Sequence, residues 1–185
     1  MTVTLRERNR QAAMEQVRAV AFDLMSTHGF DAVTVEQIAA RSSVSPSTVY
    51  RYFGTKEALV LSSSRPAHLL ERLRETGETT WADAFRRAAV DVWQADPTAA
   101  VELGLIVAND PLMHAWERQL LDQRTDIAAA FAARRGKSGG AKDDARAAAA
   151  IGVLTAALLR WHGDAASKKS LDRLLAKAFD ALRTD

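Results

Sequence analysis

The chain has 185 residues, 48% of them hydrophobic, with 25 lysines and arginines against 23 acidic residues and a net charge of +2. This length is enough for one large domain or two small ones with a buried core. The absence of cysteine excludes disulfides, thiolate catalysis and cysteine-ligated metals. No apolar run is long enough to span a membrane, so we expect a cytoplasmic protein that does not associate with a membrane.

The first predicted element is an amphipathic helix near the N-terminus. Its apolar residues have the spacing of a helix that packs on one side, and Gly29 is typical of a C-cap at its end. The apolar face consists of Met14, Val17, Ala21, Leu24 and Met25.

Residues 34–53 predict two short helices joined by a tight turn. Thr34 is placed to cap the N-terminus of the first helix. The chain then turns at residues 42–44. Ser45 is a good N-cap for the second helix, and Pro46 follows at the first helical position, where its missing N–H costs nothing.

The second short helix, residues 46–53, buries Val49 and Phe53 and leaves hydrogen-bonding side chains on its rim. The rim residues are Ser47, Thr48, Tyr50, Arg51 and Tyr52. Such side chains can reach a phosphate or a base edge. The pattern is therefore typical of a helix-turn-helix that binds double-stranded DNA.

The stretch 29–59 resembles the TetR family of bacterial transcriptional regulators. The family pattern is matched by Gly29, Phe30, Thr34, Val35, Ile38, Ala39, Val44, Ser45, Thr48, Tyr50, Tyr52, Phe53, Lys56, Glu57 and Leu59. The resemblance covers the N-terminal third only. At Ser43 the family usually has a glycine in the turn, and a serine forced to positive φ costs about 1 kcal/mol, so we expect a slightly remodelled turn.

The resemblance implies phosphate contacts by Thr34, Tyr52 and Lys56, with the other rim residues facing the major groove. The expected DNA-binding residues are Thr34, Ser45, Ser47, Thr48, Tyr50, Arg51, Tyr52 and Lys56. Among those facing the groove, only Arg51 can make a bidentate contact with guanine, although an outward arginine is also common on any helix. The arginines at positions 6, 8 and 10 predict either an arm on the DNA or a solvated tail.

The rest of the chain is also predicted to be helical, so the expected fold class is all-α. A helix over residues 56–76 should break near Ser64, because Pro66 lies inside it. Further helices are expected to begin at Thr80, at Asp96 and at Asp110, the last one running through Phe131. A loop over residues 135–144 precedes two closing helices, at 145–162 and at 171–182.

These elements predict two domains. Residues 1–56 form a three-helix DNA-binding domain, and residues 57–185 form a helical effector-binding and dimerisation domain. The helix at 145–162 is apolar on more than one face, and the last helix carries one apolar stripe, formed by Leu171, Leu174, Leu175, Ala178 and Leu182. The two closing helices therefore either complete a monomer core or form a four-helix bundle with a second subunit. Because a short recognition helix needs a partner to reach adjacent half-sites, we predict a homodimer through these helices, as the resemblance also implies.

In the family resembled, the C-terminal half usually encloses a small-molecule pocket. The candidate ligand-binding residues, at helical spacing, are Phe85, Trp93, Leu103, Ile106, Met113, Trp116, Leu120, Leu158 and Trp161. The same spacing is typical of a plain core. Residues 96–123 and 146–164 resemble the C-terminal domain of actinobacterial TetR proteins related to the mycofactocin regulator, which implies a fatty acyl-CoA-type effector.

We therefore predict a ligand-responsive transcriptional regulator, a repressor that binds a palindromic operator and is released by a small apolar effector. Activation and effector-independent DNA binding are the alternatives. An enzyme is the remote one, because the histidines His28, His68, His114 and His162 lack metal-ligand spacing and no nucleophile elbow is present. The sequence thus predicts no catalytic residue, metal or cofactor.

Overall fold

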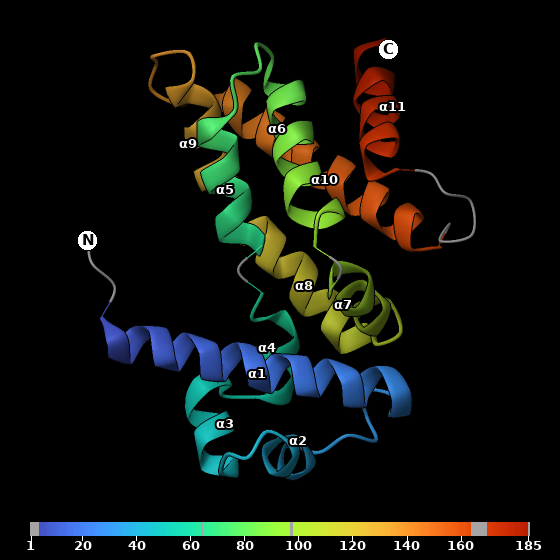
Figure 1. The fold of residues 1–185 in the computed structure, drawn as a ribbon. Coiled ribbons are helices and arrows are strands. Elements are labelled where there is room, and N and C mark those ends of the chain that lie inside the picture. The colour runs from blue at the N-terminus through green and yellow to red at the C-terminus, as the bar shows by residue number, and fades with distance from the viewer. Residues whose placement is uncertain (1–3, 64, 97, 164–169, 185) are drawn as a thin grey trace. The chain divides into compact units, whose positions relative to one another are not determined.

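The computed structural model describes residues 4–63, 65–96, 98–163 and 170–184, and over these residues it contains helices and no strand (Figure 1). This confirms the all-α prediction. The chain folds into two compact units, Met1–Ser63 and Ser64–Asp185. The division falls after Ser63 and not after Lys56, where the sequence placed it, because the helix that begins at Lys56 packs on the first unit.

Residues 4–63 of the first unit contain four helices. They are α1 (Leu5–His28), α2 (Val35–Arg41), α3 (Pro46–Phe53) and α4 (Lys56–Leu61). The predicted face of α1 packs against α2 and α4. The fully buried side chains include Val17, Ala21, Met25, Ile38, Ala39 and Leu59. This packing holds the two short helices, which are too short to be stable alone.

The turn between α2 and α3 keeps a left-handed residue. Ser43 has a φ of 56°, the only positive φ of a non-glycine residue in the described part of the chain. The conformation that the family builds with glycine is thus adopted by serine, at a cost of about 1 kcal/mol.

The second unit contains seven α-helices and one π-helical segment in its described residues. They are α5 (Arg65–Glu75), α6 (Trp81–Ala89), η1 (Val90–Gln94), α7 (Thr98–Val107), α8 (Asp110–Asp122), α9 (Arg124–Ala133), α10 (Ala141–Gly163) and α11 (Leu171–Thr184). The break predicted in residues 56–76 is confirmed, since α4 ends at Leu61 and Pro66 lies in the first turn of α5. Thr80 caps α6, also as predicted, by accepting from the N–H of Asp83.

The single helix predicted from Asp110 through Phe131 is wrong. The chain turns at Gln123 and divides it into α8 and α9, although neither proline nor glycine marks the place. Both helices pack on α10, but α8 also packs on α7, whereas α9 also packs on α5. The N-cap of α8 is also Asn109, one residue before the predicted Asp110.

Helix α10 is the longest in this unit and packs against α6, α7, α8, α9 and α11 (Figure 1). This confirms that it is buried on more than one side. It begins at Ala141 and not at residue 145, because its first turn holds the buried Asp143 between Arg135 and Arg146. In α11 the residues packed inward are Leu171, Leu175 and Phe179, whereas the expected stripe member Leu182 is 57% exposed.

A buried charge cluster joins the start of α5 to the start of α7. The guanidinium of Arg65 donates to the Glu102 carboxylate, and its Nη2 lies 2.8 Å from Asp96 Oδ2 and 2.8 Å from Thr98 Oγ1. The side chains of Arg65 and Glu102 are each 5% exposed. Burial raises the pKa of Asp96, but hydrogen bonds from Thr98 and the charge of Arg65 outweigh it and hold that pKa below its usual value.

Candidate nucleic-acid interface

Helix α3 is a short, firmly capped helix with an exposed polar face. The Oγ of Ser45 accepts from the N–H of Thr48 at 3.2 Å and lies 2.9 Å from Ser47 Oγ. Ser47 and Arg51 are exposed, and Tyr50 is 48% exposed although it is a large aromatic residue. The buried members of the helix are Val49 and Phe53, as predicted. The cap therefore orients a row of donors toward solvent, in the manner of a recognition helix.

Thr34 caps α2 in a reciprocal arrangement. Its Oγ1 accepts from the N–H of Gln37 at 3.2 Å, and the Gln37 side chain accepts from the N–H of Thr34 at 2.8 Å. Because the Thr34 hydroxyl only accepts in this cap, its O–H is available to a phosphate at the positive end of the helix. The phosphate contact itself stays a prediction.

Lys56 has a role that the sequence did not indicate. Its Nζ donates to the carbonyl oxygens of Phe30 at 2.8 Å and Val33 at 3.0 Å, and it lies 4.2 Å from the centre of the Phe30 ring. An ammonium has three donors, so one remains for a phosphate. Lys56 thus joins α4 to the connection between α1 and α2. This structural role does not depend on its predicted phosphate contact.

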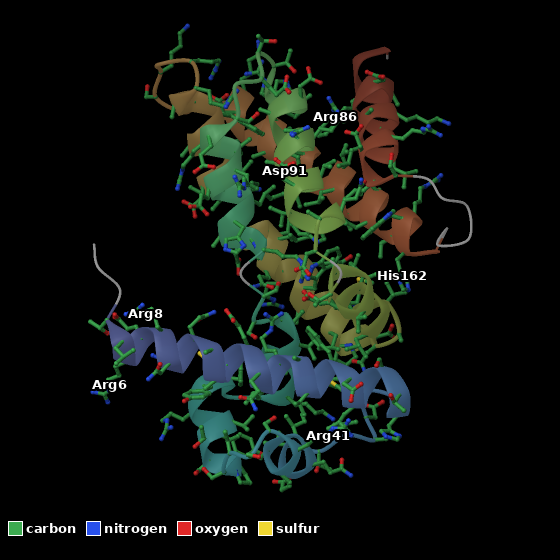
Figure 2. All side chains as sticks on the ribbon, in the orientation of Figure 1. Arg6, Arg8, Arg41, Arg86, Asp91 and His162 are labelled. Atoms are coloured by element: carbon green, nitrogen blue, oxygen red, sulfur yellow. The ribbon has the colours of Figure 1, made fainter. Side chains whose placement is uncertain are left out.

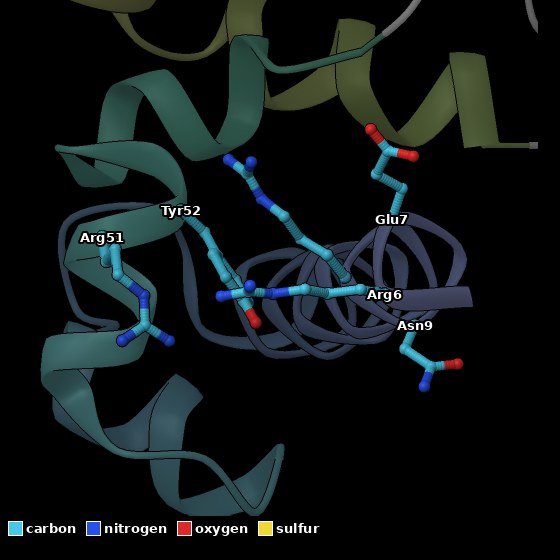
Figure 3. Close-up of a pocket in the computed structure, with 6 residues that line it drawn as sticks. Arg6, Glu7, Asn9, Arg51 and Tyr52 are labelled. Carbon is cyan, nitrogen blue, oxygen red and sulfur yellow. The ribbon is translucent and has the colours of Figure 1, made fainter. Parts of the chain in front are cut away.

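A cleft of about 710 Å³ lies between the N-terminal turns of α1 and the end of α3. It is lined by Arg6, Glu7, Asn9, Arg10, Arg51 and Tyr52. Figure 3 shows Tyr52 between Arg51 and Arg6, with Glu7 and Asn9 further away on α1. The guanidinium carbons of Arg10 and Arg51 lie 5.9 Å and 5.4 Å from the centre of the Tyr52 ring. Three positive charges against one carboxylate make this cleft suited to a phosphate backbone.

The N-terminal arginines are part of this surface because they are helical. Thr4 forms a capping box with Glu7, so α1 already begins at Leu5. Arg6 and Arg8 therefore lie on the first turns of α1 (Figure 2), and not in an arm or a tail ahead of it. Sequence reasoning missed that cap, although the Thr-x-x-Glu spacing is a recognised signal of a helix start.

The predicted ligand-binding residues lie in the core of the second unit. Most of them are at most 4% exposed, whereas Met113 and Trp161 are half-buried. The fully or nearly fully buried ones are Phe85, Trp93, Leu103, Ile106, Trp116, Leu120 and Leu158. Their role in ligand binding stays a prediction.

Within the described residues, no group of three or more histidines and carboxylates is placed to hold a metal ion. Among the same residues, no helix has the length and apolar character needed to cross a membrane.

Helix α3 follows α2, is capped and exposes a polar face, and a basic cleft lies beside it. These features define a helix-turn-helix DNA-binding protein with a separate helical unit. Residues 17–62 match the family model of bacterial regulatory proteins of the tetR family. By this match, the N-terminal part of the chain is a DNA-binding domain of the TetR family of transcriptional regulators.

Two relatives and one solved structure support this assignment. HTH-type regulator YdeS of Bacillus subtilis is 43% identical over 47 residues, which cover 25% of this chain and only 24% of that protein. MftR of Mycobacterium tuberculosis, whose name assigns it to the regulation of mycofactocin biosynthesis, is 26% identical over 95% of this chain and 91% of its own length. Thermus thermophilus FadR, a TetR-family repressor solved with lauroyl-CoA, shares the fold with a TM-score of 0.63, 20% identity and coverage of 91% and 92%.

Arg51 and Arg10 flank the same ring, so their alanine variants form a matched pair. We expect Arg51→Ala to relax base preference at one operator position, because a bidentate contact to guanine contributes about 1–3 kcal/mol of discrimination. Arg10→Ala should weaken binding to all sequences alike and reduce the salt slope by about one, as loss of a phosphate contact does. Selection of binding sites from a random duplex library, with affinities at several salt concentrations, measures both. Equal weakening across all sequences by Arg51→Ala would make it a phosphate ligand.

Proposed function

We propose that this protein is a transcriptional repressor that binds a palindromic operator as a homodimer and leaves it when a small apolar effector binds the second unit. The observation that carries DNA binding is the exposed polar face of α3 beside the basic cleft. The DNA contacts come from the predicted DNA-binding residues in and next to α2, α3 and α4. Arg6 and Arg10 make further contacts with the phosphate backbone of the DNA.

The homodimer is proposed to form through α10 and α11. A groove of about 460 Å³ between these helices is lined mainly by small and aliphatic side chains with three cations among them. Its apolar members include Ala156, Leu174, Ala178 and Ala181. Leu174 and Ala178 turn away from the inward stripe of α11 and stay half-exposed. Packing of these residues on a second copy would bury them in a four-helix bundle.

A fatty acyl-CoA is the proposed effector class. Two observations favour it: the likeness to MftR over nearly the whole chain, and the fold shared with the FadR that was solved with lauroyl-CoA. The core that would take the chain combines large rings with many alanines of α9 and α10, and an apolar pocket between helices is a common ligand site in bundles.

Lauroyl-CoA at about one hundred times its dissociation constant should stabilise the protein by about 2.7 kcal/mol. For a chain of this size that corresponds to a rise in Tm of about 5–10 °C. The same addition should release the protein from its operator in a gel-shift experiment. Coenzyme A without the acyl chain is the control and should do neither. A Tm and an operator affinity that lauroyl-CoA leaves unchanged would remove this effector class without affecting the assignment of DNA binding.

Activation is the second candidate role. Footprinting on the protein's own upstream region separates the two, since a repressor should cover a short palindrome that overlaps the promoter. Half-sites of a dimer should lie about one helical turn, roughly 34 Å, apart or a multiple of it. Broad protection without a palindrome would instead favour effector-independent, architectural binding.

A further inference from the structure

A second cleft, of about 600 Å³, lies in the second unit at the start of α6, beside the end of α9 and near α10 and α11. We name it the Trp81 cleft after the side chain at its centre. Its volume is within the range of small-molecule sites. Its lining comes from four separate helices, so the cleft exists only in the folded unit.

One wall of the Trp81 cleft is aromatic. The Trp81 ring meets Phe131 edge-on with centres 5.6 Å apart and Phe179 with centres 5.5 Å apart. Both phenylalanines are at most 4% exposed, whereas Trp81 is half-buried. Phe85 packs behind them, with centres 6.3 Å from Phe131 and 6.2 Å from Phe179. Phe85, one of the candidate effector-binding residues, therefore lies directly behind this aromatic wall.

The cleft is also lined by two guanidiniums that share a single carboxylate. Arg135 Nη2 lies 2.5 Å from Asp143 Oδ2, and Arg146 Nη1 lies 3.4 Å from Asp143 Oδ1. The Asp143 side chain is only 3% exposed, so it stays behind the arginines. One of these two positive charges therefore remains uncompensated. The guanidinium carbon of Arg146 also lies 5.9 Å from the centre of the Trp81 ring.

A third guanidinium is fixed at the edge of the cleft, and no ion pair links it to a carboxylate of the described residues. Arg134 donates to the carbonyl oxygens of Leu73 at 3.1 Å and Thr76 at 2.7 Å, and to that of Glu78. Carbonyl oxygens carry no formal charge, so Arg134 keeps its own. The Glu78 carboxylate on the lip offsets one charge, which leaves the lining with a net positive charge.

We propose that the Trp81 cleft binds a small monovalent organic anion with an aromatic body. The ring of the ligand would lie against Trp81, and its carboxylate or sulfonate would accept from Arg135 and Arg146. Glu78 and Asp143 disfavour a polyanion, because each additional negative charge would approach them. The proposal rests on the lining of the Trp81 cleft and does not depend on the effector proposed above.

The probe that matches this chemistry is 1-anilinonaphthalene-8-sulfonate, titrated by fluorescence into the full chain. N-phenyl-1-naphthylamine has the same rings without the sulfonate and serves as the neutral control. We expect the sulfonate to bind at least about fivefold more tightly, the effect of one favourable charge contact near a protein surface. Equal affinity of the two compounds would contradict the proposal.

Thr79 gives the variants that locate the binding, because it lines the cleft and is exposed, so that its replacement leaves the packed rings unchanged. Thr79→Lys should tighten binding of the sulfonate about threefold and Thr79→Glu should weaken it about threefold, with no change for the neutral compound. The control is Thr125→Glu on α9, nine residues before Arg134 and therefore roughly 13 Å along the helix, beyond the Debye length of about 8 Å. If both Thr79 variants bind like the unchanged protein, the probe binds elsewhere and the proposal fails. The titration does not measure operator binding, so failure of this proposal leaves the proposed function unaffected. The proposed function is tested separately by operator binding.

Discussion

Lys56→Met is expected to lower the free energy of unfolding by about 2–3 kcal/mol, the range for hydrogen bonds to a charged group. Methionine keeps the unbranched stem of the half-buried side chain but removes the ammonium. The carbonyl oxygens of Phe30 and Val33 then lose a donor, and the contact with the Phe30 ring loses its cation. The measurement is urea unfolding followed by far-ultraviolet circular dichroism.

The same variant separates the structural role of Lys56 from its predicted role on DNA. If the ammonium also binds a phosphate, affinity for all sequences should fall and the salt slope should decrease by about one. If it only joins α4 to the connection after α1, the slope should not change. Lys56→Arg is the control, since it keeps the charge. A Lys56→Met protein as stable as the parent would contradict the structural role.

Glu102→Ala is expected to lower the free energy of unfolding by about 3 kcal/mol or more. It removes one partner of a buried pair and leaves the Arg65 guanidinium with only the partly exposed Asp96 as a counter-charge. Breaking a buried ion pair in this way typically costs about 3–5 kcal/mol. Chemical unfolding with a thermal scan as a second probe measures the effect.

The double variant Arg65→Met with Glu102→Leu shows whether the loss comes from an uncompensated charge. Replacing both partners by apolar residues is often neutral or stabilising, so the double variant should regain most of the stability that Glu102→Ala loses. The exposed pair of Arg72 and Glu75 on α5 provides the comparison, because its removal should cost less than about 1 kcal/mol. A double variant no more stable than Glu102→Ala would contradict an uncompensated charge as the cause of the loss.

The helix-turn-helix was predictable from the sequence because its determinants are local. Thr34 and Ser45 accept hydrogen bonds from N–H groups three residues further on, and Pro46 lies at the first helical position as expected. Such signals act over a single helical turn, so they can be recognised in the sequence without knowledge of the fold. The positive φ of Ser43 was not predicted, because its cost for a serine led us to expect a remodelled turn.

Tertiary packing decided the features that depend on residues far apart in the chain. Lys56 reaches carbonyl oxygens 23 and 26 residues earlier, and nothing in its own neighbourhood indicates those partners. The turn at Gln123 has no breaker residue, and it separates α8, which packs on α7 and α10, from α9, which packs on α5 and α10. Local spacing specifies which residues a helix buries. Only the folded chain specifies which residues they pack against, and both arginine-lined clefts are formed by this tertiary packing.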